Sequence, residues 1–412
     1  MGLADIPRTL ALLEQERLDG LLVTGPENFE YFAGASSHPL SMWRRIGPVS
    51  AVINRDGLHS LIASDAQEGA VSRANPDTDV LSYPAWIERL GVEEDQNLSA
   101  EDLIGRATSG RENLRPETYD EALVYSLVKE ALQNAGLIGK RVGVEFESAP
   151  HLDVLRLNEL VPDTEFVNSS PLIRELRVIK TKAEIDLLRV ASELAEIGIV
   201  ASLHGADGST SALDVRTRYG EAVSAEARAR KLHGFRSSRT TVHLGPHLWG
   251  TGDPARTLQP GDLIQFDSGA QVGGYNSDIG RTFVYQKPTQ QQQRIQEALL
   301  AGYRAGVNEL KPGRRYCDVF NVTQETVRAA GFPSYSRGHF GHSIGSEIFG
   351  EEWPWISATE TRVLEPGMVV AFEVPYYING IGGFQNEDNI LITENGHVSF
   401  NSTPMDLKVI GT

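Results

Sequence analysis

The sequence LQPGDLIQFD at residues 258–267 returns in altered form as LEPGMVVAFE at residues 364–373, 106 positions further along the chain. Each copy has the pattern of a Pro-Gly turn followed by an apolar strand that ends in a carboxylate. Downstream of each copy, GGYNSD at residues 273–278 is matched by GGFQNE at residues 382–387. Two matches in the same order predict a duplicated structural half that supplies two acidic side chains each time.

Helix starts recur along the same part of the chain. Thr181-x-x-Glu184 and Thr289-x-x-Gln292 both have the capping-box pattern, in which two side chains satisfy backbone N–H groups at a helix start. Apolar residues follow each box at helical spacing. Each half is therefore expected to contain helices followed by strands, which predicts a pseudo-twofold α+β domain.

The front of the chain has a different pattern, in which short apolar runs alternate with amphipathic stretches. This alternation predicts an α/β domain over residues 1–168, followed by the duplicated domain over residues 169–412. Segment 36–45 is expected to be a polar loop, and segment 95–118 a surface excursion. The expected strands of the first domain cover residues 18–24, 50–53, 58–63 and 141–145.

Composition narrows the class of protein. The chain has 412 residues with 55 acidic and 38 basic side chains, and its formal net charge of −17 disfavours nucleic acid and acidic membrane surfaces as partners. Cys317 is the only cysteine, which excludes an internal disulfide and favours a reducing compartment. Because no apolar run reaches the ~20 residues that span a bilayer, a cytoplasmic protein is expected.

The two copies of the duplicated half together contain four acids: Asp267, Asp278, Glu373 and Glu387. Asp267 and Glu373 end apolar strands, where an uncompensated carboxylate costs several kcal/mol of desolvation. Salt bridges are one solution, since Arg281 follows Asp278 and Arg256 precedes Asp267. Such pairs are too few for four acids, so the pattern favours a divalent-metal site. Two acids from each half suit a pair of ions about 3.5–4 Å apart.

An imidazole lies between the two acid pairs, in the sequence GHSIG at residues 341–345. Its flanking glycines let the backbone bend closely around a ligand. If His342 joins the acids, the preferred metal shifts from magnesium or calcium toward manganese, cobalt, iron or zinc. A histidine between glycines is also a common turn residue, so this pattern alone leaves its role open.

These motifs together resemble the pita-bread metallopeptidases, which include aminopeptidase P, prolidase, methionine aminopeptidase and the non-peptidase creatinase. The matching stretches are GYNSDIGRTF with Asp278, GHSIG with His342, EPGMVVAFE with Glu373 and GGFQNEDNILIT with Glu387, preceded by Asp267. LDGLLVTGPENFEYFAG at residues 18–34 also resembles the creatinase-type N-terminal domain, which methionine aminopeptidase lacks. The resemblance implies a creatinase-like N-terminal α/β domain followed by a pseudo-twofold pita-bread catalytic domain.

The resemblance also implies a ligand set and a reaction. Asp267 would bind one metal, His342 and Glu373 the other, and Asp278 and Glu387 both. Manganese is expected for the two divalent ions, with cobalt, zinc or iron as alternatives. A hydroxide between the metals would attack the amide carbon while Glu373 accepts the proton, so the implied reaction is hydrolysis of the Xaa-Pro bond.

The sequence departs from the family pattern at three positions. Gly250 stands where proline-directed members carry a histidine, Phe349 stands near the place of a second one, and Gln385 replaces an arginine. Loss of that arginine puts bidentate recognition of a substrate carboxylate in doubt. Candidates for the missing histidines are His339 in catalysis and His243 and His247 in substrate binding, although each could be an ordinary surface or structural histidine.

A loop of the first domain provides two further candidates for substrate binding, Trp43 and Arg44, followed by Arg45. In dimeric family members the N-terminal domain reaches the active site of a neighbouring subunit, so a homodimer is expected here. The alternative is an exposed basic loop without that role.

The sequence thus predicts a metal-dependent Xaa-Pro dipeptidase or aminopeptidase that acts on short peptides. The alternative is a metal-dependent hydrolase of a small non-peptide amide or cyclic amidine, of the creatinase or ectoine-hydrolase kind, which the altered histidines favour. A pita-bread binding module without catalysis is a third possibility, and the five retained ligand-type residues argue against it.

Overall fold

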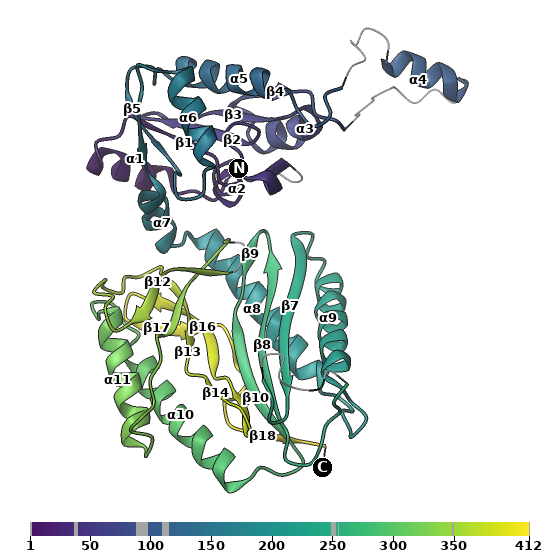
Figure 1. Ribbon diagram of the computed structural model, residues 1–412, viewed down its shortest axis with the longest axis vertical. Helices are drawn as coiled ribbons and strands as arrows, with labels where there is room; N and C mark the ends of the chain where they lie inside the picture. The colour runs from purple at the N-terminus through teal and green to yellow at the C-terminus, as the bar shows by residue number, and fades with distance from the viewer. Residues whose placement is uncertain are drawn as a thin grey trace. The chain divides into compact units, whose positions relative to one another are not determined.

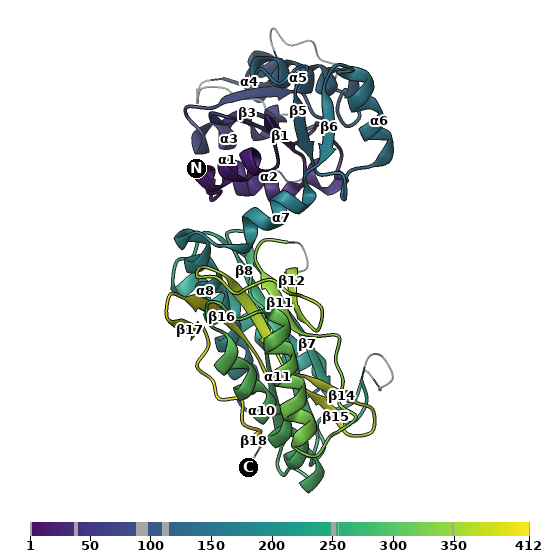
Figure 2. The same ribbon diagram turned by 90° about the vertical axis from the view of Figure 1, so that its left-hand side faces the viewer.

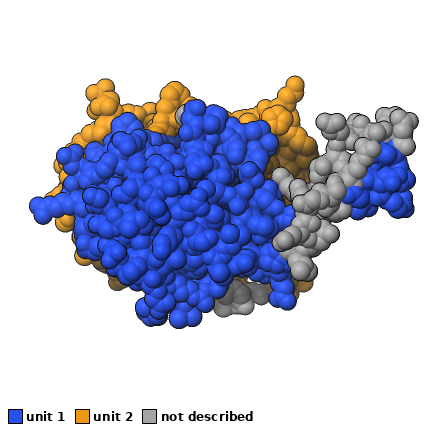
Figure 3. Space-filling model, turned by 90° about the horizontal axis from the view of Figure 1, so that it is seen from above, with its two compact units in different colours: residues 1–176 blue, residues 177–412 orange. Residues whose placement is uncertain are grey.

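The computed structural model describes residues 2–36, 40–87, 98–108, 115–248, 253, 255–347 and 350–411. The chain divides into two compact units, residues 1–176 and 177–412, which Figure 3 shows in different colours. The boundary expected after residue 168 precedes helix α7 (Ser170–Val178), whereas the division of the chain falls inside that helix.

Unit 1 is built on a six-stranded sheet with the order β4-β3-β2-β1-β5-β6. Its four expected strands are confirmed, and every residue of β1 is buried. Helices lie against the sheet on both sides (Figures 1 and 2). The strands are β1 (Gly20–Val23), β2 (Ser50–Asn54), β3 (Gly57–Ser64), β4 (Asp79–Tyr83), β5 (Arg141–Val144) and β6 (Glu165–Asn168). The helices are α1 (Ile6–Gln15), α2 (Pro26–Ala33), α3 (Asp65–Ala74), α4 (Ala100–Thr108), α5 (Glu121–Asn134) and α6 (His151–Leu160).

Two of the expected irregular segments of unit 1 contain short helices. The polar segment 36–45 includes the 3-10 helix η1 (Leu40–Trp43), and the excursion 95–118 includes α4. Among the described helices of the whole chain, none combines the length and the apolar character needed to cross a bilayer.

Unit 2 contains the predicted duplication. Its main sheet has the order β12-β11-β13-β16-β10-β8-β7, so β11-β13-β16 on one side mirrors β7-β8-β10 on the other. The strands of this path are β7 (Phe235–Leu244), β8 (Leu263–Val272), β10 (Ile279–Tyr285), β11 (His339–Ile344), β12 (Glu351–Ser357), β13 (Val369–Glu373) and β16 (Glu387–Thr393). Shorter strands are β9 (Tyr275–Asn276), β14 (Tyr376–Ile378), β15 (Gly382–Phe384), β17 (Gly396–Ser399) and β18 (Lys408–Ile410).

A pair of helices precedes the strands in each half of unit 2. These are α8 (Lys182–Ser202) with α9 (Ala212–Ala229), and α10 (Gln290–Glu309) with α11 (Tyr316–Ala329). Figure 1 shows the two pairs on opposite sides of the unit, with the strands between them. Both capping boxes form as predicted, at Thr181 with Glu184 and at Thr289 with Gln292.

Glycines bring helices close to the elements that carry the acids. In α10, a side chain at Gly306 would collide with Phe372, the neighbour of Glu373 on β13. In α8, Gly198 lets Tyr219 of α9 approach, and the Tyr219 hydroxyl donates to the Gly269 carbonyl of β8 at 3.0 Å. Tight packing of this kind fixes strand positions, so β8 and β13, which carry Asp267 and Glu373, have a rigid support.

Candidate metal centre

Three predicted ligands lie in one row across the middle of the sheet. Asp267 on β8 is in register with Gly280 on β10, Gly280 with Glu387 on β16, and Glu387 with Glu373 on β13. Side chains that are in register on neighbouring strands project from the same face of a sheet. Asp278 precedes Gly280 by two residues and so belongs to the same face. The duplicated strands thus bring all four acids to one side of the sheet.

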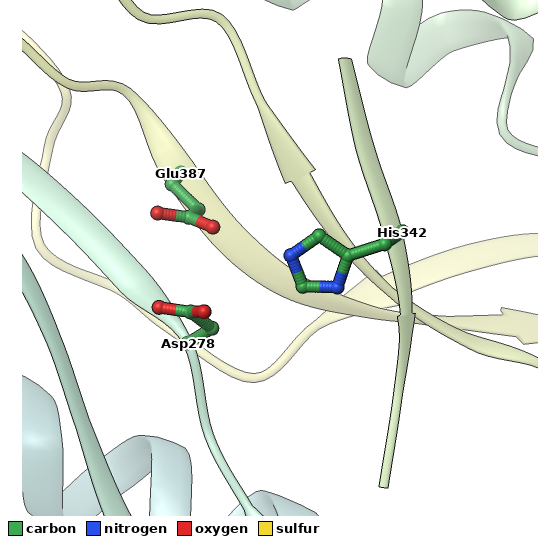
Figure 4. A group of neighbouring side chains, drawn as sticks. All are labelled: Asp278, His342 and Glu387. Atoms are coloured by element: carbon green, nitrogen blue, oxygen red, sulfur yellow. The ribbon is translucent and has the colours of Figure 1, made fainter. Parts of the chain in front are cut away.

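Asp278, His342 and Glu387 converge most closely (Figure 4). Each offers one ligand atom, and these three atoms lie within 4.8 Å of one another. All three residues are buried, and Oδ1 of Asp278 has no hydrogen-bond partner in the structure. A buried oxygen without a partner costs free energy unless a ligand satisfies it, so this oxygen indicates a place for a cation.

The orientation of His342 agrees with a ligand role. Its Nδ1 lies 2.9 Å from the carbonyl oxygen of Ser343. Because a carbonyl can only accept, Nδ1 must carry the proton, which leaves the lone pair of Nε2 for a metal. Two carboxylates and an imidazole so arranged fit a divalent ion of the manganese, iron, cobalt or zinc type.

The pKa shifts of Asp278 and Glu387 also indicate a cation site. Burial raises the pKa of Asp278 and that of Glu387 well above their ordinary values, and the nearby acids raise both pKa values further. Arg239 opposes the shift at Asp278. The fold therefore holds two carboxyl groups where their charged forms are disfavoured, and a bound divalent cation would reverse that preference.

Arg239 on β7 is the main feature that the sequence did not reveal. Its guanidinium contacts Asp267 Oδ1 at 3.2 Å and Asp278 Oδ2 at 2.6 Å. The two arginines considered from the sequence serve other acids, since Arg281 binds Asp388 and Arg256 binds Asp262.

The acids of the other half have different partners. Gln385 donates from Nε2 to Glu373 Oε2 at 3.0 Å and to Glu387 Oε2 at 2.9 Å, and its Oε1 accepts from the Tyr377 hydroxyl. Arg337 donates to Glu373 Oε1 at 2.8 Å. Gln385 fits because position 280 is a glycine, where any side chain would collide with it.

His339 lies beside this acid pair. Its Nδ1 is 3.6 Å from Glu373 Oε1. Burial lowers the pKa of His339, so its imidazole is neutral at neutral pH. The structure thus places both residues predicted for proton transfer next to each other.

Comparison with known proteins identifies the family. Residues 183–394 match the model of metallopeptidase family M24, and residues 6–179 match the creatinase/prolidase N-terminal domain. The chain belongs to metallopeptidase family M24. Membership confirms the predicted resemblance and makes the chain a metallopeptidase, an enzyme of a class that uses divalent metal ions.

Relatives of this M24 chain include an Xaa-Pro dipeptidase and a creatinase. It is 32% identical to the Xaa-Pro dipeptidase of Pyrococcus furiosus over 248 residues, which cover 59% of this chain and 68% of that enzyme. It is 28% identical to a creatinase from Bacillus sp. over 316 residues, which cover 70% of this chain and 74% of that enzyme.

Solved structures confirm the two-domain fold. An Xaa-Pro dipeptidase from Bacillus anthracis matches with a TM-score of 0.78 at 22% identity, over 98% of both chains. The prolidase from Pyrococcus horikoshii matches with a TM-score of 0.74 at 22% identity, over 97% of this chain and 99% of that one. The M24 chain therefore has the predicted creatinase-like domain followed by a pita-bread domain.

The two histidines predicted to bind substrate lie on and just beyond β7 of this M24 chain. His243 on β7 is half-buried, and its Nδ1 lies 2.6 Å from Oε1 of Gln265, two residues before Asp267 on β8. His247 is exposed beyond the end of β7. Gly250 and Phe349, where family histidines are expected, lie outside the described residues.

The loop residues predicted to bind substrate have partners inside unit 1. The Trp43 ring packs 5.4 Å from Trp86, measured between centroids, and Arg44 pairs with Glu27. Arg45 contacts Asp153 at 2.7 Å. Their role at the active site of a neighbouring subunit stays a prediction.

Proposed function

We propose that this chain hydrolyses the bond before proline in Xaa-Pro dipeptides with a divalent ion held by Asp278, His342 and Glu387. The observation that supports this most directly is the convergence of these three ligand atoms around the unpartnered Oδ1 of Asp278. The Xaa-Pro bond is chosen because several relatives are Xaa-Pro dipeptidases, among them the Pyrococcus furiosus enzyme at 32% identity.

The chemistry needs a nucleophile, a proton acceptor and a proton donor. A divalent ion would activate a water molecule and polarise the scissile carbonyl. Glu373, which Arg337 and Gln385 hold by hydrogen bonds, would accept the proton that the water loses as its oxygen bonds to the carbonyl carbon. The C–N bond then breaks, and the proline nitrogen needs a proton to leave as a secondary amine. His339, whose Nδ1 lies 3.6 Å from Glu373, would pass the proton from Glu373 to the proline nitrogen.

The identity of the ion follows from its donors. Carboxylates with one imidazole favour manganese over magnesium or calcium, and cobalt, zinc and iron accept the same donors. The two-ion centre expected from the sequence stays a prediction, because Asp267 and Glu373 already have guanidinium partners. A homodimer and a cytoplasmic location belong to the proposal on the evidence of the sequence alone.

A second candidate function has its own support. A dipeptide carries a carboxylate after proline, and Gln385 stands where family members often carry an arginine. The creatinase relative covers 70% of this chain and acts as a family precedent for another substrate class. Hydrolysis of a small non-peptide amide or cyclic amidine is therefore the alternative.

One assay separates the two candidates. Chelator-treated protein reloaded with manganese is offered Xaa-Pro dipeptides, the matching Xaa-Ala dipeptides and creatine, with the His342→Gln variant as the control. We expect turnover of the Xaa-Pro peptides alone, and its loss in the variant. Turnover of creatine alone would favour the alternative. Metal loading without any turnover would contradict both and leave a binding module.

A further inference from the structure

The guanidinium of Arg239 lies where the expected arrangement requires a second ion. We infer that the centre binds a single divalent ion and that Arg239 permanently replaces the other. The inference deepens the proposed function and rests on it only in using the same acids as metal ligands.

Arg239 engages the two acids that would surround the missing ion. In the expected two-ion centre Asp267 belongs to one metal and Asp278 contacts both. Here Arg239 contacts Asp267 Oδ1 at 3.2 Å and Asp278 Oδ2 at 2.6 Å. The other oxygen of Asp278, Oδ1, is buried without a partner. Asp278 can therefore bridge a guanidinium and one ion, as a bridging carboxylate joins two ions.

The charges around the centre balance with one ion. Asp267, Asp278, Glu373 and Glu387 carry four negative charges when ionised, and Arg239 and Arg337 carry two positive ones. One divalent ion neutralises the remainder, whereas two ions would leave an excess of two positive charges before any hydroxide is counted. An arginine side chain stays protonated in proteins, so it cannot relieve that excess by losing a proton.

The neighbouring strand β8 lies directly alongside Arg239. Arg239 is in register with Gly269 on β8, and the close approach of the Ser277 carbonyl requires a glycine at that position. Hydrogen bonding of the Gly269 carbonyl to Tyr219 fixes that glycine in place. The guanidinium thus lies beside both acids, on a side chain that is partly exposed.

The experiment counts metal ions. Chelator-treated protein is reloaded with excess manganese, freed of unbound ion, and analysed for manganese per chain by mass spectrometry and for spin coupling by electron paramagnetic resonance. We expect one ion per chain and an uncoupled spectrum. Arg239→Ala should bind two ions and show an exchange-coupled spectrum, because Asp267 and Asp278 Oδ2 become available. Arg236→Ala removes a charge from an exposed position of the same strand and should still bind one.

Two results would overturn the inference: two ions in the unaltered protein, or a single ion in a folded Arg239→Ala variant. Should Arg239→Ala fail to fold, Arg239→Gln offers a neutral side chain with a similar stem and the same expected rise to two ions. The experiment distinguishes a failure of this inference from a failure of the proposed function. One ion without Xaa-Pro turnover contradicts that function alone, and two ions with turnover contradict the inference alone.

Discussion

The two halves of unit 2 place their acids alike and satisfy them differently. In the first half, Asp267 and Asp278 share the guanidinium of Arg239. In the second half, Glu373 and Glu387 share the neutral amide of Gln385, and Arg337 reaches only Glu373. The two acids of the first half thus share one cation, whereas the two acids of the second half share an uncharged donor and only one of them binds a cation.

This difference shows why backbone symmetry does not produce a symmetric metal centre. Strand register places the four acids, but the charge of their partners decides which oxygens remain available to an ion. Among the described residues, the carboxylate of Glu387 has an amide donor and no guanidinium donor, and Oδ1 of Asp278 has no hydrogen-bond partner. The available oxygens therefore lie near the junction of β10 and β16, where His342 also points (Figure 4).

The largest effect is expected from removing a ligand of the second half. Glu387→Gln keeps the shape of the side chain but removes its charge, so the ion should be lost and kcat/KM should fall about 10³-fold, or ~4 kcal/mol of transition-state stabilisation. Metal analysis and dipeptide kinetics measure both effects. Glu394→Gln, in the exposed turn after the same strand, should match the unaltered protein. Full metal content in Glu387→Gln would show that the ion binds elsewhere.

Removal of the metal should destabilise unit 2. Without the ion, Asp278 and Glu387 face each other in a buried site with only partial compensation. At a free manganese concentration of about 100 times Kd, binding contributes ~2.7 kcal/mol, which corresponds to a rise in Tm of roughly 5–10 °C for a domain of this size. Calorimetry with and without chelator measures the shift. An unchanged Tm would contradict binding at these buried acids.

Replacement of Gln385 tests the role of the uncharged donor that Glu373 and Glu387 share. Gln385→Leu removes the amide that orients Glu373 and Glu387, and loss of such an outer partner typically lowers metal affinity about 10- to 100-fold. Manganese titration measures the affinity. Gln293→Leu on the exposed surface of α10 is the matched control. If Gln385→Leu binds manganese as tightly as the unaltered protein, the amide does not organise the acid pair.

The sequence predicted the duplication because its signals are local. Pro-Gly turns, apolar runs and both capping boxes can be read within about ten residues each. The four acids fall inside the repeated motifs, so the symmetry that the repeat implies was enough to predict that they lie together. His342 lies outside the repeat, in GHSIG, and the resemblance to the family predicted its role as a ligand.

Arg239 could not be predicted because its partners are set by strand register. It lies on β7 and meets Asp267 and Asp278 only through the pairing of β7 with β8. Nearness in sequence was misleading for Arg281, which follows Asp278 by three residues. Side chains alternate along a strand, so an odd spacing sends Arg281 to the opposite face, where it binds Asp388.

The smallest effect is expected at the two capping boxes, where the halves also differ by a charge. Glu184 in α8 is buried and accepts from the Thr181 amide and the Tyr275 hydroxyl, whereas the equivalent residue in α10 is the neutral Gln292. Burial raises the pKa of Glu184, so the folded state holds its proton more tightly than the unfolded state does. Its contribution to stability is therefore greatest below the ordinary glutamate pKa of about 4.3 and declines as pH rises through the folded-state value.

Glu184→Gln should remove that decline and make the first half resemble the second. We compare the free energy of unfolding of the variant with that of the unaltered protein at each pH. Between pH 4 and neutral pH this difference should shift in favour of the variant by about 1 kcal/mol or less. Urea unfolding at a series of pH values measures this difference. Gln293→Glu on α10 places a carboxylate on an exposed surface and should show no such trend. A difference that stays constant with pH would mean that Glu184 has the same proton affinity in both states.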